Sequence, residues 1–234
     1  MRRKILQCAV AAAFLSAVAA PVFASPAWAA DFLITTEEYP PYNMTYNGEI
    51  TGIATDLVKA MFDKAGVAYK IDMLPWNRAI HLAQTQKNVC VYSTTETEER
   101  KPLFAWVGPL AENNWVLFGR ADAGAVGALE EVRGKSIGGY SGDAISLFLE
   151  KEGHKVEAAP RDDLNVPKLI NGRIDYWATG SELGPYLAQQ QGAAGAVKPL
   201  LTFKKTVLSL ACHPDSDPAD LAKLRAALAG LRTK

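Results

Sequence analysis

Residues 91–100 read Val-Tyr-Ser-Thr-Thr-Glu-Thr-Glu-Glu-Arg and mark the end of a predicted buried strand. The apolar run that starts at Val89 ends in hydroxyl side chains, and Arg100 closes the Thr- and Glu-rich segment that follows. A strand end, a helix start with free N–H groups and a guanidinium can together hold a small carboxylate. A capped helix with a surface arginine explains the ten residues equally well. The choice therefore depends on the rest of the chain.

Strand-like and helix-like segments alternate on both sides of this stretch. The predicted strands are residues 32–36, 69–74, 89–93, 115–119, 135–140, 156–159, 176–179 and 207–211. The predicted helices are one around 57–62 that Thr55 could cap and Gly66 could end, then 77–86, 143–151, 163–171, 181–191, and one opened by Asp217-Pro218. This alternation is typical of α/β proteins with mostly parallel sheets. Because it occurs in two sets, we expect two lobes, each a mostly parallel sheet flanked by helices, with a ligand cleft between them.

The N-terminal residues have the pattern of a signal peptide. Arg2, Arg3 and Lys4 precede an apolar stretch, and cleavage is expected after Ala29 or, alternatively, after Ala24. Export predicts a periplasmic location, where a disulfide can form. Cys90 and Cys212 could form one or remain buried thiols, since both lie in apolar, strand-like runs.

Charge and motif content exclude several classes of function. The chain has 25 basic and 25 acidic residues, and removal of the three basic residues of the signal peptide leaves 22 against 25. This balance gives no electrostatic reason to bind nucleic acid or an anionic membrane. The three histidines lack metal-ligand spacing, and no Cys-x-x-Cys or nucleotide-binding glycine pattern occurs. The sequence predicts no nucleic-acid partner, no metal and no cofactor.

Six motifs occur in an order that resembles one protein family. They are Glu38–Tyr42 (EYPPY), Gly48–Leu57 (GEITGIATDL), Pro75–Ala79 (PWNRA), Ser93–Arg100, Gly134–Gly138 (GKSIG) and Asn171–Asp175 (NGRID). With them, the chain resembles the bacterial extracellular solute-binding proteins of family 3, and within that family a Pro-Trp-x-Arg-Ala subgroup. These are periplasmic receptors that feed polar amino acids to ABC transporters. The resemblance implies a two-lobed, type II periplasmic-binding-protein-like fold, a monomer, and a transporter permease as partner. We expect a signal peptide over 1–29, lobe 1 over 30–113, lobe 2 over 114–206, and a return crossing with a C-terminal helix over 207–234.

The resemblance also implies which residues contact the ligand. In lobe 1 they are the aromatic residues Tyr39 and Trp76, the hydroxyl residues Ser93 and Thr95, and Arg100 as the carboxylate clamp. In lobe 2 they are Ser141, Asp143 and Glu182. Arg78 either faces the cleft as a second cation or pairs on the lobe surface.

Two positions depart from the family pattern. Gly180 stands where family members usually carry an aspartate for the ligand's ammonium group, and Glu182 could replace that aspartate or only stabilise a helix start. Asp143 stands where members often carry a hydroxyl residue; it could bind a cation, but capping the helix that it begins is the expected role.

These features predict a receptor that closes around a small polar solute bearing a carboxylate, such as an amino acid, with hinges near residues 112–115 and 205–208. Two alternatives remain open. One is a cleft enzyme, dehydratase-like or peptidoglycan-cleaving, that would use Glu37, Glu38, Glu96 or Glu182 as an acid, although surface solvation is the simpler expectation for each. The other is a sensor or scavenging binder without its own permease. No catalytic residue is predicted.

Overall fold

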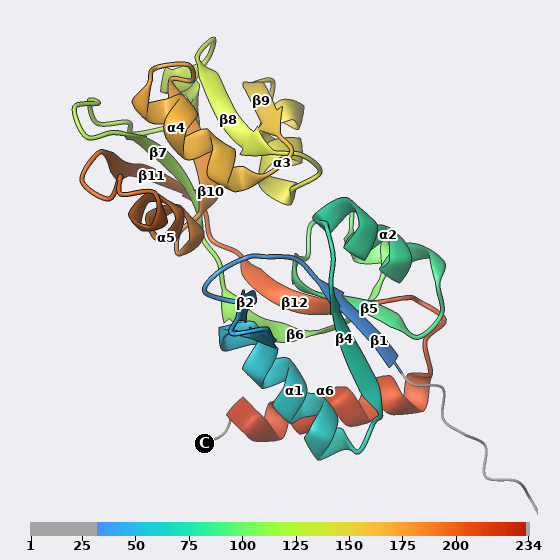
Figure 1. Cartoon of the computed structure of the whole chain (residues 1–234). Helices are drawn as coiled ribbons and strands as arrows, with labels where there is room; N and C mark the ends of the chain where they lie inside the picture. Colours follow the sequence, from blue (N-terminus) through green and yellow to red (C-terminus); the bar gives the residue numbers. More distant parts are fainter. Residues whose placement is uncertain (1–31, 233–234) are drawn as a thin grey trace, which may run out of the picture.

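The computed structural model describes residues 32–232, which form two α/β lobes (Figure 1). This confirms the predicted two-lobed α/β fold. The predicted signal peptide and its cleavage sites lie outside the described residues. Within 32–232, no helix is long and apolar enough to cross a membrane.

The first lobe is built on a five-stranded sheet of order β4-β1-β5-β12-β6. Its elements are β1 (Phe32–Thr36), β2 (Met44–Tyr46), β3 (Glu49–Thr51), α1 (Ile53–Ala65), β4 (Tyr69–Met73), α2 (Trp76–Thr85), β5 (Val89–Thr95), the 3-10 turn η1 (Lys101–Leu103), β6 (Ala105–Glu112), β12 (Val207–Cys212) and α6 (Pro218–Arg232). Helices α1 and α6 lie side by side (Figure 1) and pack with Phe32 and Ile34 of β1 in one cluster. Helix α2 packs with Val89 and Val91 of β5 in another. Because side chains alternate along a strand, the two clusters cover opposite faces of the sheet.

The second lobe has a five-stranded sheet of order β11-β7-β10-β8-β9. Its elements are β7 (Trp115–Arg120), the 3-10 turn η2 (Leu129–Val132), β8 (Ser136–Tyr140), α3 (Ala144–Lys151), β9 (Lys155–Ala159), the 3-10 turn η3 (Asp162–Leu164), α4 (Asn165–Ile170), β10 (Tyr176–Gly180), α5 (Leu183–Gln190) and β11 (Val197–Lys204). Trp115 packs with residues of α3, whereas Trp177 packs with residues of α4 in a separate cluster. Two tryptophans therefore anchor the second core.

The chain passes between the sheets twice. Strand β6 ends at Glu112 in the first sheet and β7 begins at Trp115 in the second, whereas β11 ends at Lys204 and β12 returns at Val207. The crossings lie side by side, because the backbone N–H of Asn113 donates to the carbonyl oxygen of Thr206 at 2.9 Å. Both crossings fall within the two segments where the sequence predicts the hinges; hinge motion itself stays a prediction.

The sheets are mixed, so the expectation of mostly parallel sheets is wrong. In each sheet two neighbouring strand pairs are parallel and two are antiparallel. Strands β6 and β11, which carry Pro109 and Pro199, are not among the predicted strands. Both strands lie at a sheet edge, where a proline need not donate to a neighbouring strand.

Two predicted local features differ from the structure. Thr55 lies inside α1 and does not cap it; its Oγ1 is 2.7 Å from the hydroxyl of Tyr92 in β5, with both groups buried. After Thr95 the chain forms turns and η1 in place of an α-helix. The helix-end N–H groups expected beside Arg100 are therefore not provided by an α-helix. Gly66, at φ 64°, does end α1 as predicted.

Cys90 and Cys212 form a disulfide that joins β5 to β12. The two residues stand opposite each other in the antiparallel pair, and both are fully buried. Since they are 122 residues apart in sequence, the bond encloses the whole second lobe in one covalent loop.

Candidate functional site

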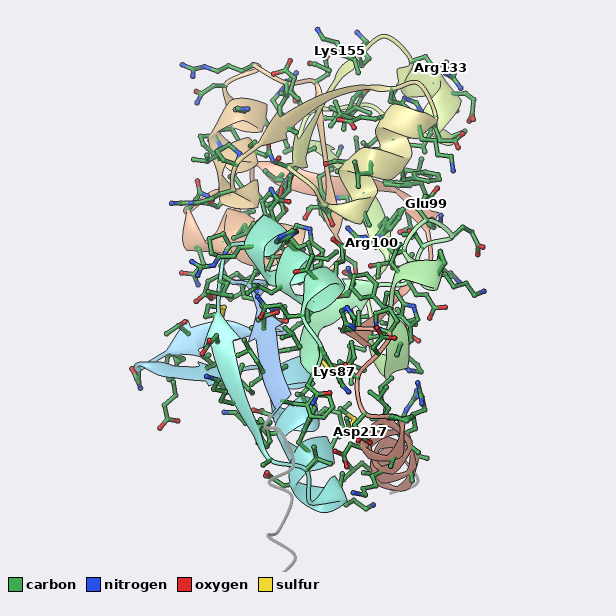
Figure 2. The ribbon with its side chains drawn as sticks, turned by 90° about the vertical axis from the view of Figure 1, so that its right-hand side faces the viewer. Lys87, Glu99, Arg100, Arg133, Lys155 and Asp217 are labelled. Carbon is green, nitrogen blue, oxygen red and sulfur yellow. A yellow bond between two sulfur atoms is a disulfide. The ribbon has the colours of Figure 1, made fainter. Side chains whose placement is uncertain are left out.

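Six predicted site residues line one small cavity between the lobes. Tyr39, Trp76, Ser93, Thr95 and Arg100 come from the first lobe and Asp143 from the second; Glu37, Asn113 and Leu208 complete the lining. Figure 2 shows Arg100 where the two lobes meet, with Glu99 beside it. The cavity measures about 10 Å³, which is room for one water molecule. The cavity is therefore too small to hold an amino acid in this arrangement of the lobes.

Arg100 and Trp76 bind the same atom of the second lobe. Arg100 is only 7% exposed, and its Nη2 donates to the carbonyl oxygen of Gly142 at 3.1 Å. The indole Nε1 of Trp76 donates to that oxygen at 2.9 Å, and the guanidinium lies 5.2 Å from the centre of the indole ring. A guanidinium carries five N–H donors, so Arg100 retains donors for an anion in the cavity.

Acidic neighbours favour the charged form of Arg100. Burial lowers the pKa of Arg100 from its ordinary value of 12.5, while Asp143, Glu37 and Glu99 raise it. The group stays cationic at neutral pH because its ordinary pKa is so high.

A β-bulge brings Ser93 to the cavity. Tyr92 and Ser93 of β5 together oppose the single residue Leu210 of β12. Ser93 adopts a left-handed φ of 57°, and its hydroxyl donates to Oδ1 of Asn43. A bulge of this kind redirects a side chain away from the regular alternation of the strand.

Tyr39 is fixed from two sides. Its ring stacks on Tyr42 with centroids 5.8 Å apart, and its hydroxyl accepts from Nδ2 of Asn113 at 3.1 Å. Burial raises the pKa of Tyr39 well above 10, so the hydroxyl stays protonated. Its proton can therefore be donated into the cavity.

Glu37 is not the solvated surface group that the sequence suggested. It lines the cavity, and its Oε2 accepts from the hydroxyl of Tyr140 in the second lobe at 2.8 Å. Burial raises the pKa of Glu37 to about 8, with smaller contributions from Asp143 and Asp162, while Tyr140 and Arg100 lower it. Hence Glu37 is largely protonated at neutral pH.

Asp143 performs the expected capping role and also lines the cavity. Its carboxylate accepts from the backbone N–H of Ile145 at 3.3 Å, at the start of α3. Burial raises the pKa of Asp143, and Arg100 acts in the opposite direction.

Asp162 is a residue that sequence reasoning missed. It accepts from the indole of Trp177 at 2.8 Å and from the amide of Asn165 at 3.0 Å, and it also bonds the hydroxyl of Thr179. Burial raises its pKa to about 6. A signal was present, because Asp162 follows the carboxyl end of a predicted strand.

The remaining predicted residues lie outside the small cavity. Arg78 on α2 and Glu182 before α5 are exposed, and Ser141 does not line the cavity. At Gly180, an added Cβ would collide with Oδ1 of Asn113 and lie 2.7 Å from the hydroxyl of Tyr39. Position 180, where family members usually carry an aspartate, thus has no room for a side chain in this protein.

A larger chamber adjoins the small cavity. It measures about 640 Å³ and shares Glu37 and Tyr39 with the small cavity. Its other polar lining includes Glu38, Thr45, Tyr140, Arg161, Asp162, Asp163 and Tyr186. Arg161 forms an ion pair with Asp163, and the lining carries two further acidic side chains, Glu38 and Asp162. Among the described residues, no group of three or more His, Cys, Asp or Glu side chains could hold a metal ion.

Three solved structures illustrate the likeness of the fold. A histidine kinase sensor domain with similarity to periplasmic binding proteins has a TM-score of 0.80 at 19% sequence identity, covering 87% of this chain and 91% of its own. The arginine-, lysine-, histidine-binding protein ArtJ from Geobacillus stearothermophilus has a TM-score of 0.76 at 19% identity, covering 87% and 90%. An ancestral arginine-binding protein bound to glutamine has a TM-score of 0.75 at 25% identity, covering 87% and 92%.

Sequence comparison agrees with the fold. No curated protein sequence matches the chain. The family model for bacterial extracellular solute-binding proteins, family 3, matches residues 33–233. The chain therefore belongs to family 3 of the bacterial extracellular solute-binding proteins.

Proposed function

We propose that the protein is a periplasmic receptor that captures an amino acid between its lobes and delivers it to an ABC transporter. The observation that carries this proposal is the buried guanidinium of Arg100 in the interlobe cavity. Arginine binds carboxylates by two parallel hydrogen bonds, and the low polarity of a buried site strengthens them. Asp143, from the other lobe, lines the same cavity, so one solute could contact both lobes.

The charge of the adjoining chamber favours a solute with a cationic side chain. Apart from the protonated Glu37 and the Arg161–Asp163 ion pair, the charged side chains in the described lining are those of Glu38 and Asp162. Its three tyrosines, Tyr39, Tyr140 and Tyr186, can also offer ring faces to a cation. Solved structures with this fold include arginine-binding proteins. L-Arginine is therefore the first solute to test.

Hinge closure would convert binding into a signal for the permease. In the closed arrangement the lobes are joined by the Gly142 carbonyl, by the Glu37–Tyr140 hydrogen bond and by the Glu99–Lys151 ion pair. A solute that contacts both lobes stabilises the closed arrangement by its additional contacts there. The permease would recognise the closed lobes.

A thermal-shift panel tests the proposal. Protein unfolded and refolded to remove co-purified solutes is mixed with each of the twenty amino acids. We expect L-arginine or a related cationic amino acid to raise Tm by several degrees and to be recovered unchanged. If none of the twenty raises Tm, the proposal fails; if the stabilising compound is converted to a product, the cleft is that of an enzyme.

A sensor role is the second candidate, favoured by the likeness to the histidine kinase sensor domain. Uptake of radiolabelled L-arginine by cells with and without the gene separates the two roles. Loss of uptake supports transport. Unchanged uptake, together with binding in vitro, supports a sensor or scavenging binder.

A further inference from the structure

Asn113 occupies a special place in the molecule. It lies in the first crossing, between β6 of one lobe and β7 of the other. Its side chain is 2% exposed and lines the small cavity together with Arg100. A contact at Asn113 is therefore a contact at both the cavity and the hinge.

One polar atom of Asn113 has no partner. Its backbone N–H donates to Thr206, its backbone carbonyl accepts from the hydroxyl of Thr206, and its Nδ2 donates to the hydroxyl of Tyr39 at 3.1 Å. Within residues 32–232, no donor reaches Oδ1, although this atom is buried. Buried polar atoms are nearly always hydrogen-bonded, so an orphan acceptor beside a cavity requires an explanation.

The charges around the cavity indicate which kind of hydrogen-bond donor is favoured at Oδ1 of Asn113. Asp143 lines the cavity from the second lobe, and Arg100, from the first lobe, is the one cationic side chain among the described residues that line it. A positively charged N–H donor is favoured near the carboxylate of Asp143, while an anion is favoured at the guanidinium of Arg100. One small cavity thus offers an anion site and an acceptor for an ammonium group.

The absence of a side chain at Gly180 leaves room for the amide oxygen of Asn113. Because a Cβ at position 180 would collide with Oδ1, the amide fills the space that a side chain on β10 would need. The acceptor at this place is therefore carried on the hinge crossing and not on β10.

We propose that Oδ1 of Asn113 accepts a hydrogen bond from the ammonium group of an α-amino acid whose carboxylate binds Arg100. This inference rests on the proposed function and deepens it, because it selects amino acids against carboxylic acids that lack the α-amino group. It also makes a hinge residue part of the binding site, so solute binding acts directly on the crossing.

Isothermal titration calorimetry with two matched probes tests the inference. The probes are L-arginine and 5-guanidinopentanoic acid, which is arginine without its α-amino group. They are titrated into the refolded wild-type protein and into N113L, N113D and N114L. Asn114 is the matched control, since it is the next residue along the crossing but does not line the small cavity.

We expect wild type to prefer L-arginine by about tenfold to hundredfold, the range of a hydrogen bond to a charged group. N113L should lose this preference by weakening L-arginine binding, with less than about a threefold change for 5-guanidinopentanoic acid. N113D keeps an acceptor and adds a negative charge, so the preference should increase. N114L should bind both probes as wild type does.

Four outcomes would overturn the inference. If N113L weakens both probes equally, Asn113 only braces Tyr39 and the hinge. If N113L does not fold, the test rests on N113D. A preference of N113D for L-arginine over 5-guanidinopentanoic acid that is equal to or smaller than that of wild type rules out the ammonium contact. If wild type binds neither L-arginine nor any other amino acid, the proposed function fails as well. Binding of L-arginine with a preference unaffected by Asn113 sinks this inference alone.

Discussion

The carboxyl group of Glu37 in the first lobe accepts a 2.8 Å hydrogen bond from the hydroxyl of Tyr140 in the second lobe. Because the partners belong to different lobes, the bond exists only when the lobes are closed. Burial of Glu37 raises its pKa to about 8, so the bond involves a carboxyl group that is mostly protonated at neutral pH. The hydrogen bond from Tyr140 favours the ionised carboxylate, but burial favours the protonated form and has the larger effect on the pKa of Glu37.

Glu37→Gln should remove a pH dependence of stability. Between pH 4.5 and about 8, the folded protein holds a proton on Glu37 that the unfolded chain has released. The free energy of unfolding therefore falls as pH rises through this window, and even one unit of raised pKa corresponds to about 1.4 kcal/mol. Glutamine cannot ionise, so E37Q should lack the fall.

Denaturant unfolding of wild type and E37Q at several pH values from 6 to 8 measures this effect. The measurements start at pH 6 because of Asp162. Its pKa of about 6 makes the free energy of unfolding depend on pH in the same direction below that value. E37Q should gain stability relative to wild type as pH rises. Parallel curves for the two proteins would show that Glu37 titrates in the folded protein as it does in the unfolded chain.

Gly142→Ala should open the cleft. Gly142 has a left-handed φ of 77°, and a Cβ there would collide with the side chain of Asn77 in the other lobe. The closed arrangement should become less populated, and the radius of gyration measured by small-angle X-ray scattering should increase.

Gly192→Ala is the matched control for Gly142→Ala. Gly192 has a similar φ of 66°, but nothing lies within 4 Å of its added Cβ. Both variants should lose about 1 kcal/mol of stability from backbone strain, yet only G142A should expand. The double variant N77A/G142A should return toward the wild-type radius. An unchanged radius in G142A itself would show that the Asn77 side chain moves aside and the lobes stay together.

Reduction of the Cys90–Cys212 disulfide should destabilise the protein by about 2–5 kcal/mol, since the bond closes a long loop. Denaturant unfolding with and without a reductant measures this loss. The variant C90A/C212A serves as control and should not respond to the reductant. A loss under about 1 kcal/mol in wild type would contradict the expected contribution of the bond.

Features of the fold and the site that depend on local sequence patterns could be predicted from the sequence. Alternation of apolar segments located most strands and helices, and motif order located Arg100, Trp76 and Tyr39, which the structure brings to one cavity. The edge strands β6 and β11 were not predicted, because an internal proline is read as a break in a strand. Only the sheet order shows that they lie at edges, where a proline is tolerated.

The acidic part of the site depends on tertiary burial, which no local pattern reveals. Glu37 and Asp162 resemble ordinary surface carboxylates in the sequence, and only the opposing lobe or the neighbouring strand buries them. The unpartnered amide oxygen of Asn113 likewise emerges only when both crossings and β10 are in place.

Calorimetry of L-arginine with Arg100→Ala tests the central claim most directly. The matched control is Arg173→Ala, because Arg173 is an exposed arginine of the second lobe that does not line the cavity. Loss of one partner of a buried charge pair costs about 2–5 kcal/mol, so R100A should bind L-arginine at least about thirtyfold more weakly than wild type, and R173A should bind it equally well. Wild-type affinity in folded R100A would contradict the account.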